Sequence, residues 1–98
     1  MKVLKLEGNS ISEAEAENTL EALQAAVDGY IETVTLIPDK AVMLVNEEGR
    51  FRGMAPNPIA SAAANTQIVG PAIIVGVDDD EFTDVPQDVE QCIRALFA

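Results

Sequence analysis

The chain of 98 residues is 48% apolar and carries 17 acidic against six basic side chains, one cysteine and no histidine. This size and apolar content predict a single acidic domain over residues 1–98, and the formal net charge of −11 argues against direct binding to nucleic acid or to an anionic membrane. Because the usual general base and the usual zinc ligand are both missing, we expect no enzyme, no catalytic residue, no metal site and no cofactor.

The first third of the chain predicts a strand and a helix with an ambiguous segment between them. Residues 2–6 alternate as a short strand does. Residues 11–17 also alternate, but their composition suits a helix as well, and the residues themselves leave both open. Asn18 is a suitable N-cap and Gly29 a suitable end for the helix that follows. That helix would bury a stripe at helical spacing: Leu20, Leu23 and Val27.

The middle of the chain predicts a hairpin followed by a short strand. Residues 30–37 are rich in β-branched side chains, and residues 41–46 return after a Pro-Asp-Lys turn. Glu47-Glu48-Gly49 forms a second turn. We expect residues 50–53 to form a third strand after it.

The last part of the chain predicts two helices and a strand. Asn57 followed by Pro58 is a typical start for a small helix over residues 58–64. Gly70-Pro71 interrupts the strand-like residues 67–77, and because proline donates no ladder hydrogen bond we expect an edge strand or a bulge there. An exposed acidic loop at residues 78–81 precedes a last helix that opens at Pro86. Its expected buried stripe is Val85, Val89, Cys92, Ile93 and Leu96.

Together these elements predict an α+β fold. We expect a small antiparallel sheet of about five strands, packed on one face by the two main helices that begin at Asn18 and Pro86, with one short helix from Pro58.

Three short motifs, Gly29-Tyr30-Ile31-Glu32, Asn46-Glu47-Glu48-Gly49 and Pro56-Asn57, occur in a fairly specific order and spacing. Over nearly its whole length the chain resembles a family of small uncharacterised bacterial and phage proteins that are frequent in phages, plasmids and other mobile elements. The resemblance implies that residues 13–17 form a strand leading into the first helix. It implies no catalytic residue, because the family has no agreed biochemical activity.

The segment from Asn46 to Asn57 is the best candidate for a ligand site. It holds Asn46, Gly49, Arg50, Arg52 and Asn57, and it ends at the start of a helix, where free N–H groups favour anions. On a strand, Arg50 and Arg52 would point the same way and could hold a phosphate or nucleotide. The alternative is that both arginines balance neighbouring acids on a solvated face. The acidic run at residues 78–84 lacks the spacing and the glycine of a calcium loop.

Two functions follow from these observations. The first is a non-enzymatic accessory protein of a phage or mobile element that binds a host protein, itself basic, through an acidic surface, with counter-defence as one form of this role. The alternative is a small-ligand protein that binds or sequesters a nucleotide or phosphate with the loop of residues 49–57. We expect a monomer or a small homo-oligomer.

The expected location is the cytoplasm, that of the host cell if a phage encodes the chain. No apolar stretch is long enough to cross a membrane, the N-terminal residues lack a signal-peptide pattern, and a single cysteine fits a reducing compartment.

Overall fold

The computed structural model describes residues 1–97, which form six strands and three helices. Their bounds are β1 (Lys2–Glu7), β2 (Ser10–Glu15), α1 (Leu20–Val27), β3 (Ile31–Ile37), β4 (Ala41–Asn46), α2 (Pro58–Ala64), β5 (Ala72–Asp78), β6 (Glu81–Thr83) and α3 (Gln87–Leu96). The predicted α+β class with an antiparallel sheet is confirmed. The strand implied before the first helix is β2, although it ends at Glu15. None of the helices within residues 1–97 is long and apolar enough to cross a membrane.

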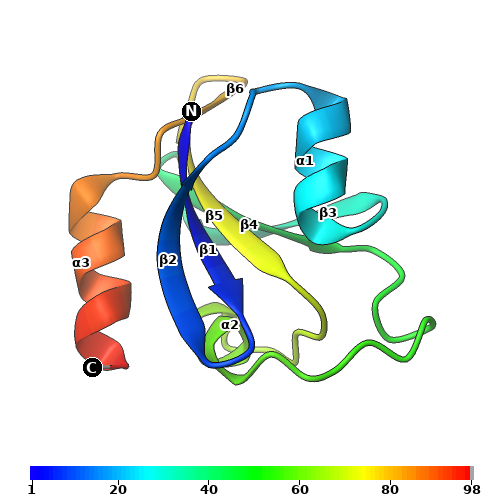
Figure 1. Ribbon diagram of the computed structural model, residues 1–98. Helices are drawn as coiled ribbons and strands as arrows, with labels where there is room; N and C mark the ends of the chain where they lie inside the picture. The colour runs from blue at the N-terminus through cyan, green and yellow to red at the C-terminus, as the bar shows by residue number, and fades with distance from the viewer. Residues whose placement is uncertain (98) are drawn as a thin grey trace.

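The sheet has the strand order β2-β1-β5-β4-β3, so β5 lies in its centre (Figure 1). One side of β5 pairs with β4, and the other pairs first with β1 and then, beyond the start of β1, with β6. The prediction that this strand lies at an edge, or carries a bulge at Gly70-Pro71, was wrong. Pro71 comes directly before the first residue of β5, so its missing N–H is not needed in the ladder.

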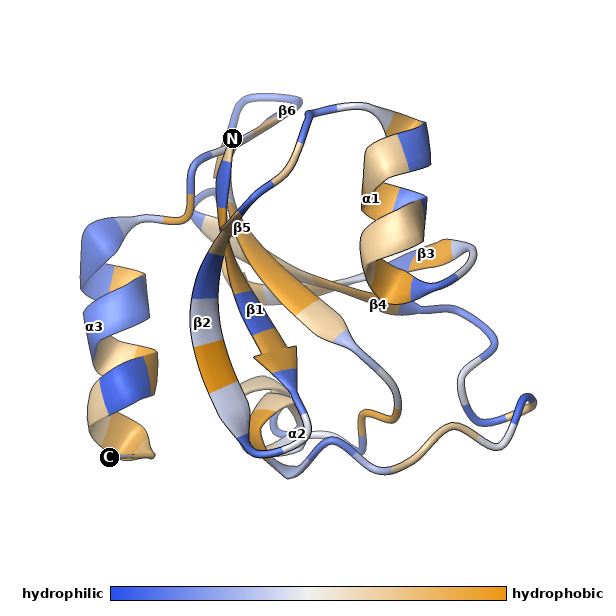
Figure 2. Cartoon of the chain, in the orientation of Figure 1, coloured by the Kyte–Doolittle hydropathy of each residue, from blue (hydrophilic) through white to orange (hydrophobic). Residues whose placement is uncertain are grey.

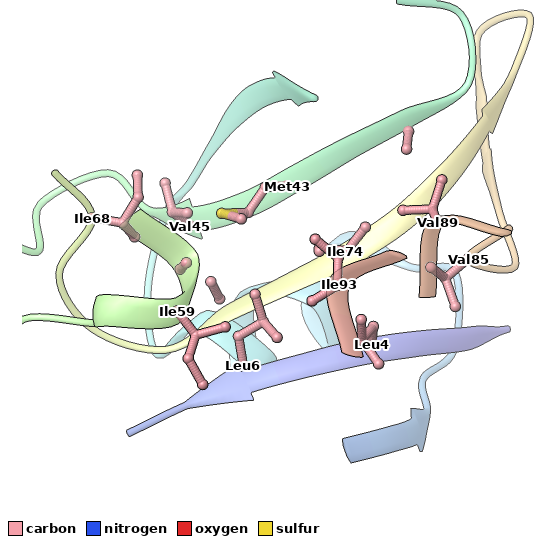
Figure 3. Close-up of a cluster of buried hydrophobic side chains, with 13 residues drawn as sticks. Leu4, Leu6, Met43, Val45, Ile59, Ile68, Ile74, Val85, Val89 and Ile93 are labelled. Carbon is pink, nitrogen blue, oxygen red and sulfur yellow. The ribbon is translucent and has the colours of Figure 1, made fainter. Parts of the chain in front are cut away.

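The two faces of the sheet carry different helices, which corrects the prediction that both main helices share one face. Leu4, Met43 and Ile74 lie next to one another across the ladder and pack with α2 and α3 in one cluster (Figure 3). Leu44 and Ile73, each one residue away along its strand, pack with α1 on the other face. Because side chains alternate along a strand, the apolar strands β4 and β5 supply both faces (Figures 1 and 2).

Both main helices bury narrower stripes than the sequence predicted. In α1 the buried residues are Leu23 and Val27, while Leu20 is 65% exposed. In α3 the buried apolar residues are Val89 and Ile93, whereas Cys92 and Leu96 are exposed. Each helix therefore packs through a narrow apolar stripe, and the side chains at the edge of the predicted stripe face water.

The start of α1 also differs from the prediction by one residue. Thr19, not Asn18, is the N-cap, and its Oγ1 accepts a hydrogen bond from the Ala22 N–H at 3.2 Å. The Asn18 side chain instead donates to the carbonyl of Phe82 at 2.9 Å. This bond ties the start of α1 to β6.

Candidate functional site

Residues 47–53 form a series of turns between β4 and α2, not the strand expected for residues 50–53. The turns are closed by backbone hydrogen bonds from Arg52 N–H to the Glu48 carbonyl at 2.8 Å and from Met54 N–H to the Gly49 carbonyl at 2.9 Å. Without a strand, Arg50 and Arg52 share no strand face, and the reason for expecting them to point together is lost.

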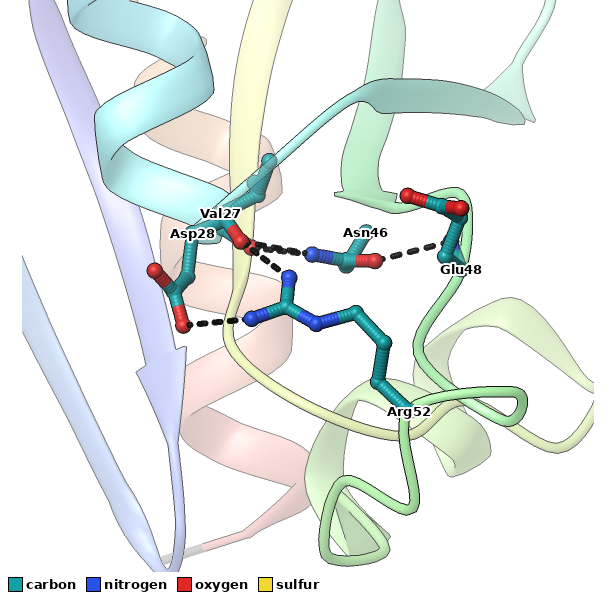
Figure 4. Close-up of polar contacts among 5 residues, drawn as sticks. All are labelled: Val27, Asp28, Asn46, Glu48 and Arg52. Atoms are coloured by element: carbon teal, nitrogen blue, oxygen red, sulfur yellow. Dashed lines mark hydrogen bonds and ion pairs between the residues drawn. The ribbon is translucent and has the colours of Figure 1, made fainter.

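Asn46, at the end of β4, is buried and holds this turn against the end of α1 (Figure 4). Its Nδ2 donates to the carbonyls of Val27 and Asp28, both at 3.0 Å, and its Oδ1 accepts from the Glu48 N–H at 2.8 Å. Gly29 makes this contact possible. A Cβ there would lie 2.8 Å from Asn46 Nδ2, on a residue whose φ is already +152°.

Asn57 is 2% exposed and makes a second junction of the same kind. Its Oδ1 caps α2 by accepting from the Ala60 N–H at 3.2 Å, and its Nδ2 donates at 2.9 Å to the carbonyls of Leu6 and Gly70. The side chain thus joins the start of α2, the end of β1 and the loop before β5. Within residues 1–97 no buried side-chain nitrogen or oxygen lacks a hydrogen-bond partner.

The two arginines point to different partners. Arg52 reaches the end of α1, where its guanidinium donates to the Asp28 carbonyl at 2.5 Å and pairs with the Asp28 carboxylate at 3.4 Å (Figure 4). Arg50 donates to the carbonyl of Gln67 at 3.0 Å, on the loop before β5. The structure therefore does not bring the predicted pair of cations together.

Gly49 is buried because Val69 packs against it: a Cβ would lie 2.8 Å from Val69 Cγ2. Beside it is a cavity of about 260 Å³ whose lining includes Asn46, Gly49 and Arg50. Glu32 and Glu47 line the same cavity, so the one cation faces two carboxylates. This volume lies just below the range of about 300–1,000 Å³ that is usual for small-molecule sites.

Positive charge is largely neutralised by ion pairs within the described part of the chain. Five of the six basic side chains pair with a carboxylate: Lys2 with Glu13, Lys5 with Glu7, Lys40 with Asp88, Arg52 with Asp28 and Arg94 with Glu90. The hydrogen bond from Lys40 lowers the pKa of Asp88 below its usual value, despite a smaller opposing effect of desolvation.

Unpaired carboxylates gather where the β5–β6 hairpin meets the start of α1. The hairpin presents residues 78–81, and the bond from Asn18 to Phe82 joins it to the start of α1 (Figure 1). Glu17 and Glu21 are neighbours of Asn18 in the sequence, on either side of that bond. We call residues 78–81 with Glu17 and Glu21 the acidic end. Between residues 1 and 97, no three acidic or cysteine side chains are arranged to hold a metal ion.

Sequence reasoning missed a pair of exposed aromatic side chains. Phe51, at the tip of the turns, is 96% exposed and Tyr30 is 62% exposed. Together with Glu47 and Glu48 they line a shallow recess of about 380 Å³. The motif around Tyr30 and the one around Glu47 were a usable signal, because the hairpin register of Ile31 with Asn46 brings the two motifs side by side.

Comparison with known proteins gives a family but no described relative. No curated protein and no solved structure matches the chain. A family of uncharacterised proteins, described as "Domain of unknown function (DUF3846)", matches residues 1–98. The chain therefore belongs to the DUF3846 family.

Proposed function

We propose that this protein is a non-enzymatic accessory protein of a phage or other mobile element and that it binds a basic host protein through its acidic end. The phage setting rests on the sequence resemblance. The binding role rests on one observation: the basic side chains of residues 1–97 are mostly ion-paired, while the carboxylates of the acidic end have no basic partner there.

A concentrated negative surface favours encounter with a positive one. Clustered like charges raise the association rate of an oppositely charged partner, and added salt screens this effect over roughly 8–10 Å. The hairpin turn places its carboxylates in water beyond the body of the sheet. Those carboxylates reach a partner surface without first breaking an internal ion pair.

The buried polar groups of the 46–57 segment have a structural role and give no support to a catalytic one. Asn46 and Asn57 use their amides to hold backbone groups of neighbouring elements. General acid–base chemistry needs a titratable group positioned against a substrate. In this segment the buried polar groups are neutral amides that already have partners.

Affinity capture from host lysate at low and high ionic strength tests the proposal. We expect a basic protein to be retained at low salt and released at high salt. A triple variant of the acidic end (Asp79→Asn, Asp80→Asn, Glu81→Gln) should lose this partner. A control triple with the same change in net charge (Glu7→Gln, Glu32→Gln, Asp39→Asn) should keep it. Equal capture by both triples, or no salt-sensitive partner at all, would contradict the proposal.

Binding of a small anion, a nucleotide or phosphate, by residues 49–57 is the second candidate. It is favoured by Arg50, which lines the cavity of about 260 Å³ and has no carboxylate partner among residues 1–97. Isothermal titration with a panel of nucleotides and inorganic phosphate tests it. Heat that disappears in Arg50→Gln would support this function, and no heat at millimolar ligand would reject it.

A further inference from the structure

Two of the four aromatic side chains are exposed on the same part of the surface, while the other two are packed. Phe82 packs against the cluster beneath α1, and Phe97 packs against the cluster beneath α2 and α3. Phe51 and Tyr30 contribute to neither cluster and are 96% and 62% exposed. A phenylalanine ring left in water forgoes the stabilisation of burial, so a neighbouring pair of exposed rings indicates a contact surface.

The turns fix the backbone that carries these rings. The Glu47 N–H donates to the Tyr30 carbonyl at 2.8 Å, which sets the two residues opposite each other at the end of the hairpin. The Glu48 N–H donates to Asn46 Oδ1, and the Arg52 N–H on the far side of Phe51 donates to the Glu48 carbonyl. A recess built on a hydrogen-bonded turn loses less conformational entropy on binding than a free loop does.

The charges around the recess select one class of ligand. Glu47 and Glu48 line it together with the two rings, and no basic side chain of residues 1–97 pairs with either carboxylate. Arg50 and Arg52 flank Phe51 in sequence, but their guanidinium groups are held by Gln67 and by Asp28. An anion would be repelled by the glutamates, and an apolar group would desolvate them without compensation.

We infer that the recess formed by Tyr30, Phe51, Glu47 and Glu48 binds a cationic side chain, an arginine or lysine of a basic protein partner. The aromatic faces attract the cation through their quadrupoles, and the carboxylates neutralise it. This inference rests on the proposed function, because it names where one basic side chain of the partner would be anchored. It is separate from the acidic end, which would provide long-range attraction.

The test uses a single cation, so that general attraction to a negative protein contributes little. The probe is the blocked tripeptide acetyl-Gly-Arg-Gly-amide, and its control is the same peptide with citrulline, which has nearly the same shape but no charge. Titration of each into the isotopically labelled protein is followed by amide NMR shifts. We expect shifts concentrated at residues 30, 47, 48 and 51 with the arginine peptide and none there with the citrulline peptide.

Variants separate a cation–aromatic contact from simple apolar contact. Phe51→Leu keeps an apolar side chain without a π face and should weaken binding about twofold to fivefold, whereas Phe51→Trp should keep or improve it. The double variant Glu47→Gln with Glu48→Gln should weaken binding more than Asp79→Asn with Asp80→Asn, which changes the net charge equally. Phe51 and both glutamates are exposed, so these changes leave the core intact.

Three results would overturn the inference: no shifts at these residues, equal binding by Phe51→Leu and the parent, or an arginine peptide that shifts only the acidic end. The third result would leave the proposed function standing, because a basic partner could still bind there. If lysate capture fails while the arginine peptide binds the recess as described, the proposed function fails and the cation site remains.

Discussion

Asn46 and Asn57 bury their amides against backbone groups, whereas the carboxylates of residues 78–81, at the opposite end of β5, stay in water. Both regions were conspicuous in the sequence for their polar residues. In the structure the two regions differ in their interaction partners. The side chain of each asparagine makes three hydrogen bonds to backbone groups. The hairpin acids have no basic partner within residues 1–97. Burial with internal partners indicates a structural role, while solvated unpaired charge is available for recognition.

The largest expected effect is that of Asn57→Ala on stability. The change removes the cap of α2 and takes the Asn57 donor from the buried carbonyl of Leu6 and the half-buried carbonyl of Gly70. We expect the free energy of unfolding to fall by about 3 kcal/mol, measured by urea denaturation. Asn9→Ala, in the exposed turn between β1 and β2, is the control and should change it by less than about 0.5 kcal/mol. An equal loss of stability in the two variants would contradict the structural role assigned to the buried Asn57 amide.

Asn46→Ala should destabilise the protein somewhat less, by about 2 kcal/mol, because two carbonyls at the end of α1 each lose one donor. Arg52 donates to one of the same carbonyls, that of Asp28. We therefore expect a double-mutant cycle of Asn46→Ala with Arg52→Met to show coupling of roughly 0.5–1 kcal/mol. If the losses in unfolding free energy of the two single variants simply add in the double variant, the two side chains are not coupled through the Asp28 carbonyl.

A smaller change, an increase in stability, is expected when charges are removed from the acidic end. Asp79→Asn with Asp80→Asn removes like-charge repulsion, and asparagine tolerates the φ of +55° at position 79. Thermal denaturation should show a gain of roughly 0.3 kcal/mol at low ionic strength that fades with added salt. Asp39→Asn, at a turn residue with a φ of +60°, is the matched control and should give a smaller gain. A loss of stability in the double variant would show that these carboxylates have an internal structural role.

The smallest expected contribution to stability is that of Asp88, an exposed acid that pairs with Lys40. Its hydrogen bond from Lys40 lowers its pKa below the usual 3.8, so the folded state is favoured above that value and loses this contribution as the pH falls through the lowered pKa. An NMR titration of the Asp88 carboxylate should show this depression, and Lys40→Met should raise the pKa back towards 3.8. An unchanged titration in the variant would remove Lys40 as the cause.

The candidate site shows how a correct local prediction can mislead about function. The sequence identified Asn57 as a helix cap and Asn46 as the end of a strand, and both are right. Whether an amide is free for a ligand depends on distant groups such as the Leu6 carbonyl, 51 positions away. The exposed pair of Tyr30 and Phe51 was missed because nothing local distinguishes a ring in water from a ring in a core.

By itself, the amino-acid order determined the hairpin of β3 and β4, the small helix after Asn57-Pro58, the antiparallel α+β class and the acidic charge. These depend on neighbours within a few positions: β-branched runs, turn residues and caps. Only the tertiary structure decided that β5 is central, that α1 and α3 lie on opposite faces and that Cys92 faces water. Strand neighbours and helix faces are chosen by contacts between residues far apart in the chain, which no local pattern of side chains encodes.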